Sequence, residues 1–182
     1  MKLKNYIAGQ WIEGSGNEIP LYNAVNGELV AVSDTEGIDF ESALHYGRTV
    51  GYKNLSSMTF YDRGEMLKKV ALYLLERKKK YYELSYKTGA THADSWVDIE
   101  GGFGTFFTYS GLAKRMLPNT PFWVDGDTQK ISANGTFLGT HILTPSEGVS
   151  VQINAYNFPV WGMMEKLSTS LLAGVPSIVK PA

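Results

Sequence analysis

Apolar and polar residues follow two different periods in the stretch from Gly148 to Ala182. Val149, Val151 and Ile153 alternate with polar residues, the period of a β-strand with one strongly apolar face. Apolar residues then recur at helical steps of three and four positions, at Val160, Met163, Met164, Leu167 and Leu171. The β-branched run Ser177–Lys180 predicts a second strand.

Residues at both ends of this helix mark its limits. Asn157 is a candidate N-cap, and Pro159 falls in the first turn, where its missing N–H leaves no helical hydrogen bond unmade. Gly174 suits a left-handed C-cap, and Pro176 stops the helix. A strand, a helix and a strand within about thirty residues predict a βαβ unit, which is nearly always parallel and right-handed.

The carboxyl ends of two parallel strands emerge at one sheet edge, where open α/β sheets bind cofactors beside helix N-termini. Ile153–Asn157 and Lys180 leave the predicted strands at that edge. An amide and an ammonium group that converge there suit a nucleotide and a developing oxyanion. Spacing alone leaves an alternative open, in which Asn157 is only a helix cap and Lys180 only a solvated strand end.

The middle of the chain is predicted to be helical. Asp39 caps one helix, the capping-box pattern Thr59–Asp62 opens a second, and shorter and longer helices follow over Tyr81–Lys87 and from about Asp94 to Met116. The second helix carries an apolar stripe formed by Met66, Leu67, Val70, Ala71, Leu74 and Leu75. The last helix contains Gly101, Gly102 and Gly104, and we interpret these glycines as sites of close helix packing, not as a dinucleotide fingerprint.

Hairpins are predicted at two places. Tyr6–Ile7 and Trp11–Ile12 flank a turn at Gly9-Gln10, and a separate strand over Leu29–Val32 follows Asn26-Gly27. After a loop over Leu117–Gly126, the turn Asn134-Gly135 joins strands at Lys130–Ala133 and Thr136–Leu138.

Composition excludes several classes of function. The net charge is −1, from 17 basic and 18 acidic residues, so no electrostatic argument favours nucleic acid or an anionic membrane. The dense basic run Arg77–Lys80 is expected at a helix C-terminus. The chain has no cysteine, which excludes disulfides and thiol chemistry within it, and its three histidines show no metal-ligand spacing. Without an apolar run long enough to span a bilayer or an export signal, a cytoplasmic protein is expected.

Several ordered motifs resemble the NAD(P)-dependent aldehyde dehydrogenase superfamily, from Tyr6 to Ala182. They are Asn157-Phe158-Pro159 before the amphipathic helix, the following Leu-Leu-Ala-Gly, and Ile178-Val179-Lys180-Pro181. The segments Thr88–Thr91 and Asp94–Gly102 narrow the resemblance to a branch that acts on CoA-linked semialdehydes from aromatic-ring degradation. This branch contains the phenylacetate-pathway oxepin-CoA hydrolase/semialdehyde dehydrogenases and the dehydroadipyl-CoA semialdehyde dehydrogenases.

The resemblance implies an α/β fold of the aldehyde dehydrogenase type, of which the chain holds an incomplete, N-terminal portion. Residues 1–123 are expected to form N-terminal strands and the helical part of the cofactor-binding domain, and residues 148–182 the first βαβ unit of its Rossmann-like parallel sheet. Residues 124–147 are expected to form a β-hairpin arm that pairs with a neighbouring subunit, so a homo-oligomer is implied.

The resemblance also implies site residues. Asn157 takes the place of the oxyanion-hole amide, and Lys180 that of the residue that binds the adenosine ribose or the extra phosphate of NADP. Pro181 and Ala182 follow Lys180 in the cofactor-binding segment, and no metal is expected. The expected cofactor is NADP or NAD, with NADP favoured because that branch mostly uses it. The remaining cofactor-binding positions are Ile153, Asn154, Ala155 and Tyr156, and Ala155 replaces a proline common elsewhere in the superfamily.

Such enzymes oxidise an aldehyde with a cysteine nucleophile and a glutamate base, and the resemblance puts both of these after Ala182. The chain by itself is therefore expected to be inactive. Three hypotheses stay open: part of an aldehyde dehydrogenase, a non-catalytic nucleotide- or CoA-binding module, and a fragment that serves assembly through the Asn134-Gly135 hairpin.

Overall fold

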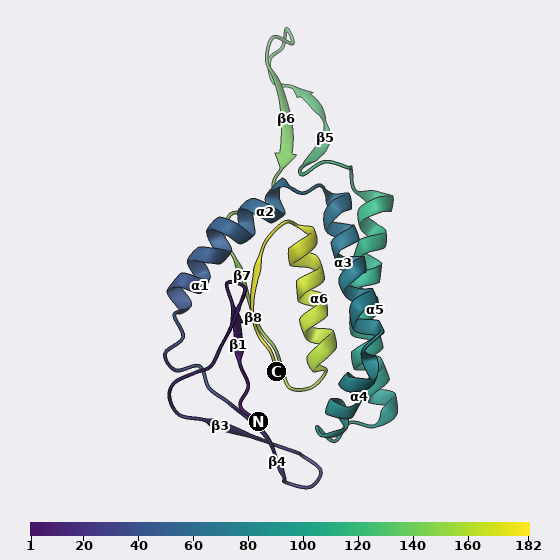
Figure 1. The fold of residues 1–182 in the computed structure, drawn as a ribbon. Coiled ribbons are helices and arrows are strands. Elements are labelled where there is room, and N and C mark those ends of the chain that lie inside the picture. The colour runs from purple at the N-terminus through teal and green to yellow at the C-terminus, as the bar shows by residue number, and fades with distance from the viewer.

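The structure is a computed structural model that describes all residues from Met1 to Ala182. A three-helix body carries a small parallel sheet, while two hairpins and a long arm lie outside it (Figure 1). The elements are β1 (Asn5–Ile7), β2 (Gln10–Ile12), β3 (Ile19–Tyr22), β4 (Leu29–Ser33), α1 (Phe40–Tyr46), a π-helical turn (Gly47–Gly51), α2 (Tyr52–Ser57), α3 (Phe60–Leu75), α4 (Lys78–Tyr86), α5 (His92–Met116), β5 (Trp123–Lys130), β6 (Leu138–Leu143), β7 (Ser150–Ile153), α6 (Pro159–Leu172) and β8 (Ser177–Lys180).

The core lies where α3, α5 and α6 meet. Gly64 of α3 allows a close approach to α5, because a Cβ added there would lie 2.6 Å from the Cβ of Ala113. The predicted stripe of α3 is buried at Leu67 and Ala71, whereas Val70 is exposed. The buried apolar residues of this core are Leu67, Ala71, Ile99, Phe103, Phe106, Ala113, Met164 and Leu172.

The predicted βαβ unit is confirmed as a parallel pair joined by α6. β7 and β8 pair in register from Ser150 opposite Ser177 to Ile153 opposite Lys180. Gly174 ends the connection with a φ of +83°, the left-handed conformation expected of it. Figure 1 shows β7 and β8 side by side, with α6 between them and the helices α3 and α5.

Close packing at the glycines of α5 is confirmed for two of the three. A Cβ on Gly101 would lie 2.4 Å from the Trp161 ring, and one on Gly102 3.0 Å from the Trp161 backbone nitrogen. Gly104 faces open space instead. The helix begins at His92, earlier than expected, because the Thr91 hydroxyl accepts a hydrogen bond from the Asp94 N–H.

The prediction for the basic run was wrong. α3 ends at Leu75, so Lys78, Lys79 and Lys80 open α4 and do not close a helix. A tertiary contact offsets the unfavourable charge at this N-terminus, because the Lys78 ammonium pairs with Glu100 of α5 at 2.9 Å. Of the four basic residues, only Arg77 interacts with the C-terminal end of α3, where its guanidinium donates to the Tyr73 carbonyl oxygen.

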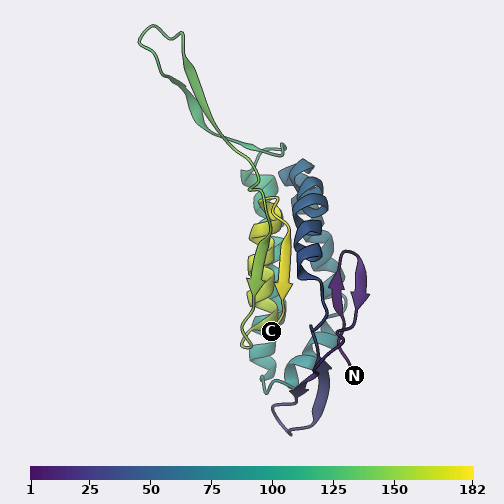
Figure 2. The same cartoon turned by 90° about the vertical axis from the view of Figure 1, so that its left-hand side faces the viewer.

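The second hairpin forms around the predicted turn, but its strands are displaced. β5 begins at Trp123, inside the segment expected to be a loop, and residues 131–137 form the tip of the hairpin in place of the predicted strands. Local hydrogen bonds explain the tip, since the Ser132 hydroxyl accepts from the Phe137 N–H and donates to the Asn134 side chain. Figures 1 and 2 show β5 and β6 projecting from the body as an arm.

The N-terminal strands form two antiparallel hairpins. The first is confirmed, although its turn lies at Ala8-Gly9, both with positive φ, one residue earlier than expected. β3, which pairs with β4, was not predicted because it contains Pro20 and has no alternating pattern. None of the helices combines the length and apolar composition required to cross a bilayer.

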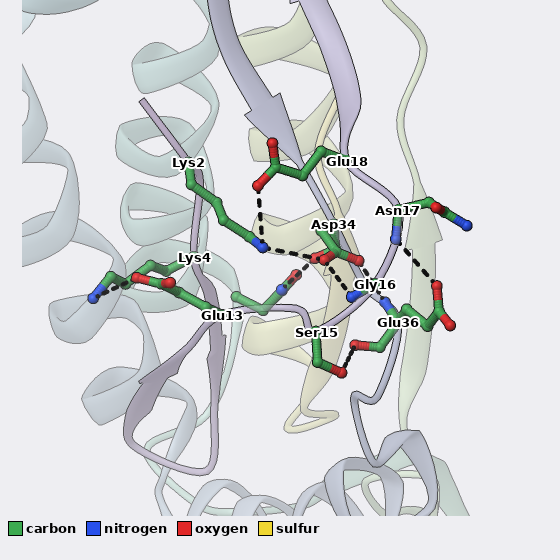
Figure 3. A network of polar contacts seen from close by, with 10 residues as sticks. Lys2, Lys4, Glu13, Ser15, Gly16, Asn17, Glu18, Asp34 and Glu36 are labelled. Atoms are coloured by element: carbon green, nitrogen blue, oxygen red, sulfur yellow. Dashed lines mark hydrogen bonds and ion pairs between the residues drawn. The ribbon is translucent and has the colours of Figure 1, made fainter.

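Asp34 links these N-terminal segments (Figure 3). Its carboxylate accepts hydrogen bonds from the N–H groups of Gly16 and Glu36, each at 2.9 Å, and pairs with the Lys2 ammonium at 3.3 Å. These backbone donors, led by Glu36, lower the pKa of the Asp34 carboxyl. The N-terminal strand, the loop before β3 and the end of β4 therefore meet at one carboxylate.

The helix predicted at Asp39 forms, and the Asp39 carboxylate accepts from the Ser42 N–H at 2.9 Å. The segment continues through the π-helical turn into α2. Its large apolar residues are partly to mostly exposed, with Phe40 57% and Val50 40% exposed. The apolar residues of α1, the π-helical turn and α2 therefore lie outside the hydrophobic core.

Candidate functional site

The candidate site lies at the carboxyl edge of the parallel pair. Ile153 is the last residue of β7 and is in register with Lys180, the last residue of β8. Residues 154–158 then lead into α6, so the segment that contains Asn157 leaves the sheet at the same edge as Lys180. The structure thus brings the segment after β7 and the end of β8 to one edge of the sheet, as the sequence predicted.

Lys180 and Tyr156 are in contact at this edge. The Lys180 ammonium lies 4.9 Å from the centre of the Tyr156 ring, a cation–π arrangement. Lys180 is exposed and Tyr156 is 77% exposed, so both groups can be reached from solvent. Ala155, Asn157, Pro181 and Ala182 are also exposed.

Asn154 joins the ends of the two strands from within. Its side-chain nitrogen donates to the Lys180 carbonyl oxygen at 3.1 Å, and its side-chain oxygen accepts from the Lys166 ammonium at 2.7 Å. The residue is only 4% exposed. Its backbone N–H also donates to the Lys180 carbonyl oxygen, at 3.2 Å, so both its side chain and its N–H are used inside the chain.

The two faces of β7 are the reverse of the usual arrangement in a small sheet. Gln152 and Asn154 are buried, whereas Val151 and Ile153 are 66% and 74% exposed. The Gln152 amide nitrogen donates to the hydroxyl oxygens of Ser170 in α6 and Ser177 in β8, whereas its Oε1 has no hydrogen-bond partner. Val151 and Ile153 consequently lie on the face of β7 that points away from α6.

The expectation that Asn157 caps α6 was wrong. The N-cap position is held by Phe158, in the left-handed conformation with φ 52° and ψ 55°, and its side chain makes no capping hydrogen bond. Pro159 does occupy the first turn, as predicted. The Asn157 side chain is therefore not committed to the helix and remains exposed.

The N-terminus of α6 is capped by Asp98 of α5, a residue distant in sequence. Its Oδ1 accepts hydrogen bonds from the N–H groups of Val160 at 3.0 Å and Trp161 at 2.8 Å. Asp98 is 4% exposed, and burial raises the pKa of its carboxyl while the two N–H donors oppose that shift. The sequence did contain a signal, because Asp98 is a charged residue on the same helical face as Ser95, Ile99 and Gly102.

No group of three or more His, Asp or Glu side chains is arranged to hold a metal ion. His92 instead stacks on the Tyr82 ring, with 5.3 Å between ring centres. Burial and a hydrogen bond to Glu100 raise the pKa of the Tyr82 hydroxyl to about 12. These groups lie on α4 and α5, and their contacts stabilise the packing of those helices.

Comparison with known proteins identifies the class of protein. Residues 11–182 match the model of the aldehyde dehydrogenase family. The chain belongs to this family, as its motifs predicted, and it has the fold of the N-terminal portion of such enzymes.

Among curated proteins, the chain is 38% identical over 183 residues to the 3,4-dehydroadipyl-CoA semialdehyde dehydrogenase of Aromatoleum evansii. That alignment covers 100% of this chain and 35% of the relative, so the chain spans about a third of the length of the protein that it matches.

Two solved structures show the same fold. The 3,6-anhydro-L-galactose dehydrogenase in complex with NADP matches with a TM-score of 0.84 and 26% identity, over 100% of this chain and 36% of that chain. PnpE in complex with nicotinamide adenine dinucleotide matches with a TM-score of 0.81 and 21% identity, over 98% of this chain and 35% of that chain. At 21% identity, the similarity to PnpE shows a shared fold only.

Proposed function

We propose that this chain forms the N-terminal part of an NAD(P)-dependent aldehyde dehydrogenase. The observation that carries the proposal is the family match over residues 11–182, together with the parallel register that leads Asn157 and Lys180 from one sheet edge. In this proposal, the remaining sequence of the enzyme supplies the cysteine nucleophile and the glutamate base, since the 182 residues contain no cysteine.

Asn157 is proposed to bind the oxygen of the substrate carbonyl. A cysteine thiolate adds to the aldehyde carbon, and the carbonyl oxygen then acquires negative charge that an amide N–H can stabilise. The exposed and uncommitted Asn157 side chain supports this role. A dinucleotide held at this edge by Lys180 and Tyr156 would supply the hydride acceptor that aldehyde oxidation requires.

The edge of the sheet has the chemistry needed by a dinucleotide. The exposed apolar side chains Val151 and Ile153 suit a flat base, and the Lys180 ammonium suits ribose hydroxyls or a phosphate. Tyr156 adds an aromatic surface in contact with Lys180. We favour NADP, and we assign further cofactor contacts to the exposed residues Ala155, Pro181 and Ala182. The buried Asn154 supports the edge through its hydrogen bonds to Lys180.

A CoA-linked semialdehyde is the proposed substrate class. The relative from Aromatoleum evansii, 38% identical across this chain, is named for such a substrate. The corresponding process is the degradation of an aromatic compound such as phenylacetate, in the cytoplasm. The alternative substrate class is a simple aldehyde such as propanal.

The hairpin arm is proposed to pair with a second copy of the chain. β5 and β6 project from the body (Figure 2). Apolar side chains on both strands are exposed. Leu138 is 60% exposed and Ile142 is 54% exposed. An arm with these residues in water would be unfavourable unless another surface covered it. The proposed assembly is a homo-oligomer, a dimer or larger.

The test is an assay of the full-length enzyme that contains this chain. Purified enzyme is given a CoA-linked semialdehyde or propanal with NADP⁺ or NAD⁺, and reduced cofactor is followed by absorbance. We expect the highest kcat/KM with the CoA-linked semialdehyde and NADP⁺. Absence of aldehyde oxidation with every combination would overturn the proposed function.

Two variants test the site, each with a matched control. Asn157→Ala should lower kcat by about 10²–10³-fold, whereas Asn54→Ala, an exposed asparagine of α2, should leave kcat unchanged. Lys180→Met should raise the KM for NADP⁺, whereas Lys53→Met should not. If a variant and its control change kcat or the KM for NADP⁺ equally, the role assigned to Asn157 or Lys180 is wrong.

Titration of the isolated 182-residue chain with NADP⁺ separates the alternative function. A chain that holds only part of a site should show no saturable binding. Saturable binding at micromolar NADP⁺ would instead support a stand-alone nucleotide-binding module.

A further inference from the structure

The start of α6 depends on a side chain from another helix. Phe158 occupies the N-cap position in a left-handed conformation, which is unusual for a residue with a Cβ, and its own side chain caps nothing. The N–H groups of Val160 and Trp161 would be left without acceptors, as they are second and third in the helix. Asp98, 62 and 63 residues earlier in the chain, accepts both of them.

α5 also provides the surface on which this helix start rests. Gly101 and Gly102 follow Asp98 by three and four positions, so all three share one face of α5. The absence of side chains at the glycines lets Trp161 and Val160 approach α5 closely. The Asp98 carboxylate and the two glycines therefore fix both the direction of the first turn of α6 and its distance from α5.

This contact also decides what the helix N-terminus can bind. Helix N-termini bind phosphate through the same N–H groups that Asp98 has taken, and a buried carboxylate there repels a second anion. The first turn of α6 is therefore not a phosphate site. Its remaining role is to hold the preceding residues 155–158, which lie between β7 and α6.

The geometry points to Asp98 as a positioning residue for Asn157, an inference that rests on the proposed function. Only Phe158 and Pro159 separate Asn157 from the Val160 N–H that Asp98 holds. The proline ring restricts its own φ, and Phe158 adopts a left-handed conformation that is unfavourable for a residue with a Cβ. The hydrogen bonds from Asp98 next to it therefore help to hold this backbone in place. At the other end, Ile153 is fixed in the strand pairing with Lys180. Asn157 thus lies in a short segment held on both sides.

The test compares Asp98→Ala and Asp98→Asn in the full-length enzyme. The alanine variant loses both acceptors, whereas an asparagine oxygen at the Oδ1 position can accept from Val160 and Trp161 as the carboxylate does. Thr59→Ala is the control, because it removes the N-cap of α3, away from the sheet edge. The readouts are kcat, the KM for NADP⁺, and hydrogen–deuterium exchange of residues 155–161.

In Asp98→Ala we expect kcat to fall by roughly 10- to 100-fold, the range for a displaced catalytic group. The KM for NADP⁺ should rise as well, because Ala155 and Tyr156 of the same segment are proposed cofactor contacts. Exchange should rise across residues 155–161, and Asp98→Asn should restore most of both signals. Thr59→Ala should leave kcat and this exchange unchanged. A kcat in Asp98→Ala equal to that of the wild type, or a loss in Thr59→Ala of the same size, would overturn the proposal.

The two proposals fail in different ways. If the wild-type enzyme oxidises no aldehyde, the proposed function is wrong, and the exchange data alone decide whether Asp98 fixes the segment that contains Asn157. If the wild type is active and exchange over residues 155–161 does not respond to Asp98→Ala, the positioning role is wrong while the function stands.

Discussion

The Arg63 guanidinium of α3 donates a hydrogen bond of 2.7 Å from Nη1 to the Leu172 carbonyl oxygen at the end of α6, 109 residues away. Arg63 is fully buried, and burial lowers the pKa of its guanidinium. Its other nitrogens donate to the carbonyl oxygens of Met58 and Pro121. One side chain thus ties together the start of α3, the segment before the arm and the end of α6.

Replacement of Arg63 should therefore be strongly destabilising. Arg63→Met leaves three carbonyl oxygens without their donor, and each buried unsatisfied group costs about 1–3 kcal/mol, so we expect a loss of about 3 kcal/mol or more. Urea unfolding of the chain measures this loss. Arg48→Met is the control, because Arg48 is exposed, and its effect should stay within about 0.5 kcal/mol. Similar losses in both variants would contradict the role assigned to Arg63.

Two glycines of α5, Gly101 and Gly104, should change the stability in opposite directions when each is replaced by alanine. Gly101→Ala places a Cβ 2.4 Å from the Trp161 ring, and overpacking of this kind destabilises by about 1–3 kcal/mol. Gly104→Ala meets nothing within 4 Å and should stabilise α5 by about 0.5–1 kcal/mol. Thermal unfolding followed by circular dichroism compares the two. A Gly101→Ala variant as stable as Gly104→Ala would show that the close contact between α5 and α6 does not exist in solution.

The pH dependence of stability should contain a distinct contribution from Asp98. Because burial raises the pKa of this carboxyl, the folded state binds its proton more tightly than the unfolded state. Its contribution to the free energy of unfolding therefore falls as the pH rises above the ordinary aspartate value of 3.8 and through the raised pKa. Asp98→Asn removes this titration, so the stability of the variant relative to the wild type should increase as the pH rises.

Urea unfolding at pH values from about 2 to about 7 measures that difference and includes the acid range in which Asp34 titrates. Asp34→Asn provides a comparison of opposite sign, because hydrogen bonds lower the pKa of Asp34 and its contribution is lost as the pH falls. A relative stability of Asp98→Asn that does not change with pH would show that Asp98 titrates normally.

The arm allows a prediction about assembly. Replacing Leu138 and Ile142 by serine removes two exposed apolar side chains from β6, each worth about 1.5–3 kcal/mol when buried. We expect the dissociation constant of the full-length oligomer to rise by at least about 10²-fold. Analytical ultracentrifugation over a range of concentrations measures the change. Val25→Ser, at another exposed apolar position, is the control, and an unaltered oligomer in the double variant would exclude the arm from the interface.

Local patterns predicted most of the elements because their causes lie within a few residues. Asp39 and Thr59 cap the helices that follow them, and Gly174 ends α6 as expected. The parallel pairing of β7 and β8 also follows from sequence, since a helix between two short strands leaves little other topology. The motif Asn157–Pro159 and the run that ends at Lys180 identified the family before the fold was known.

Other features depend on partners far away in the chain. The Lys78–Glu100 ion pair explains why a basic run begins a helix, and no local rule predicts it. The cap of α6 comes from Asp98, so the local candidate Asn157 is left exposed. β3 forms only because β4 supplies its hydrogen bonds.

The amino-acid sequence by itself determined the family, the order of most elements and the residues that reach the sheet edge. Tertiary structure alone decided that Asp98 holds the start of α6 and that Gln152 and Asn154, not Val151 and Ile153, face α6. The physical reason is that periodicity and caps report interactions within one turn or one strand. The choice of buried face and the satisfaction of buried N–H groups depend on which distant segment packs there.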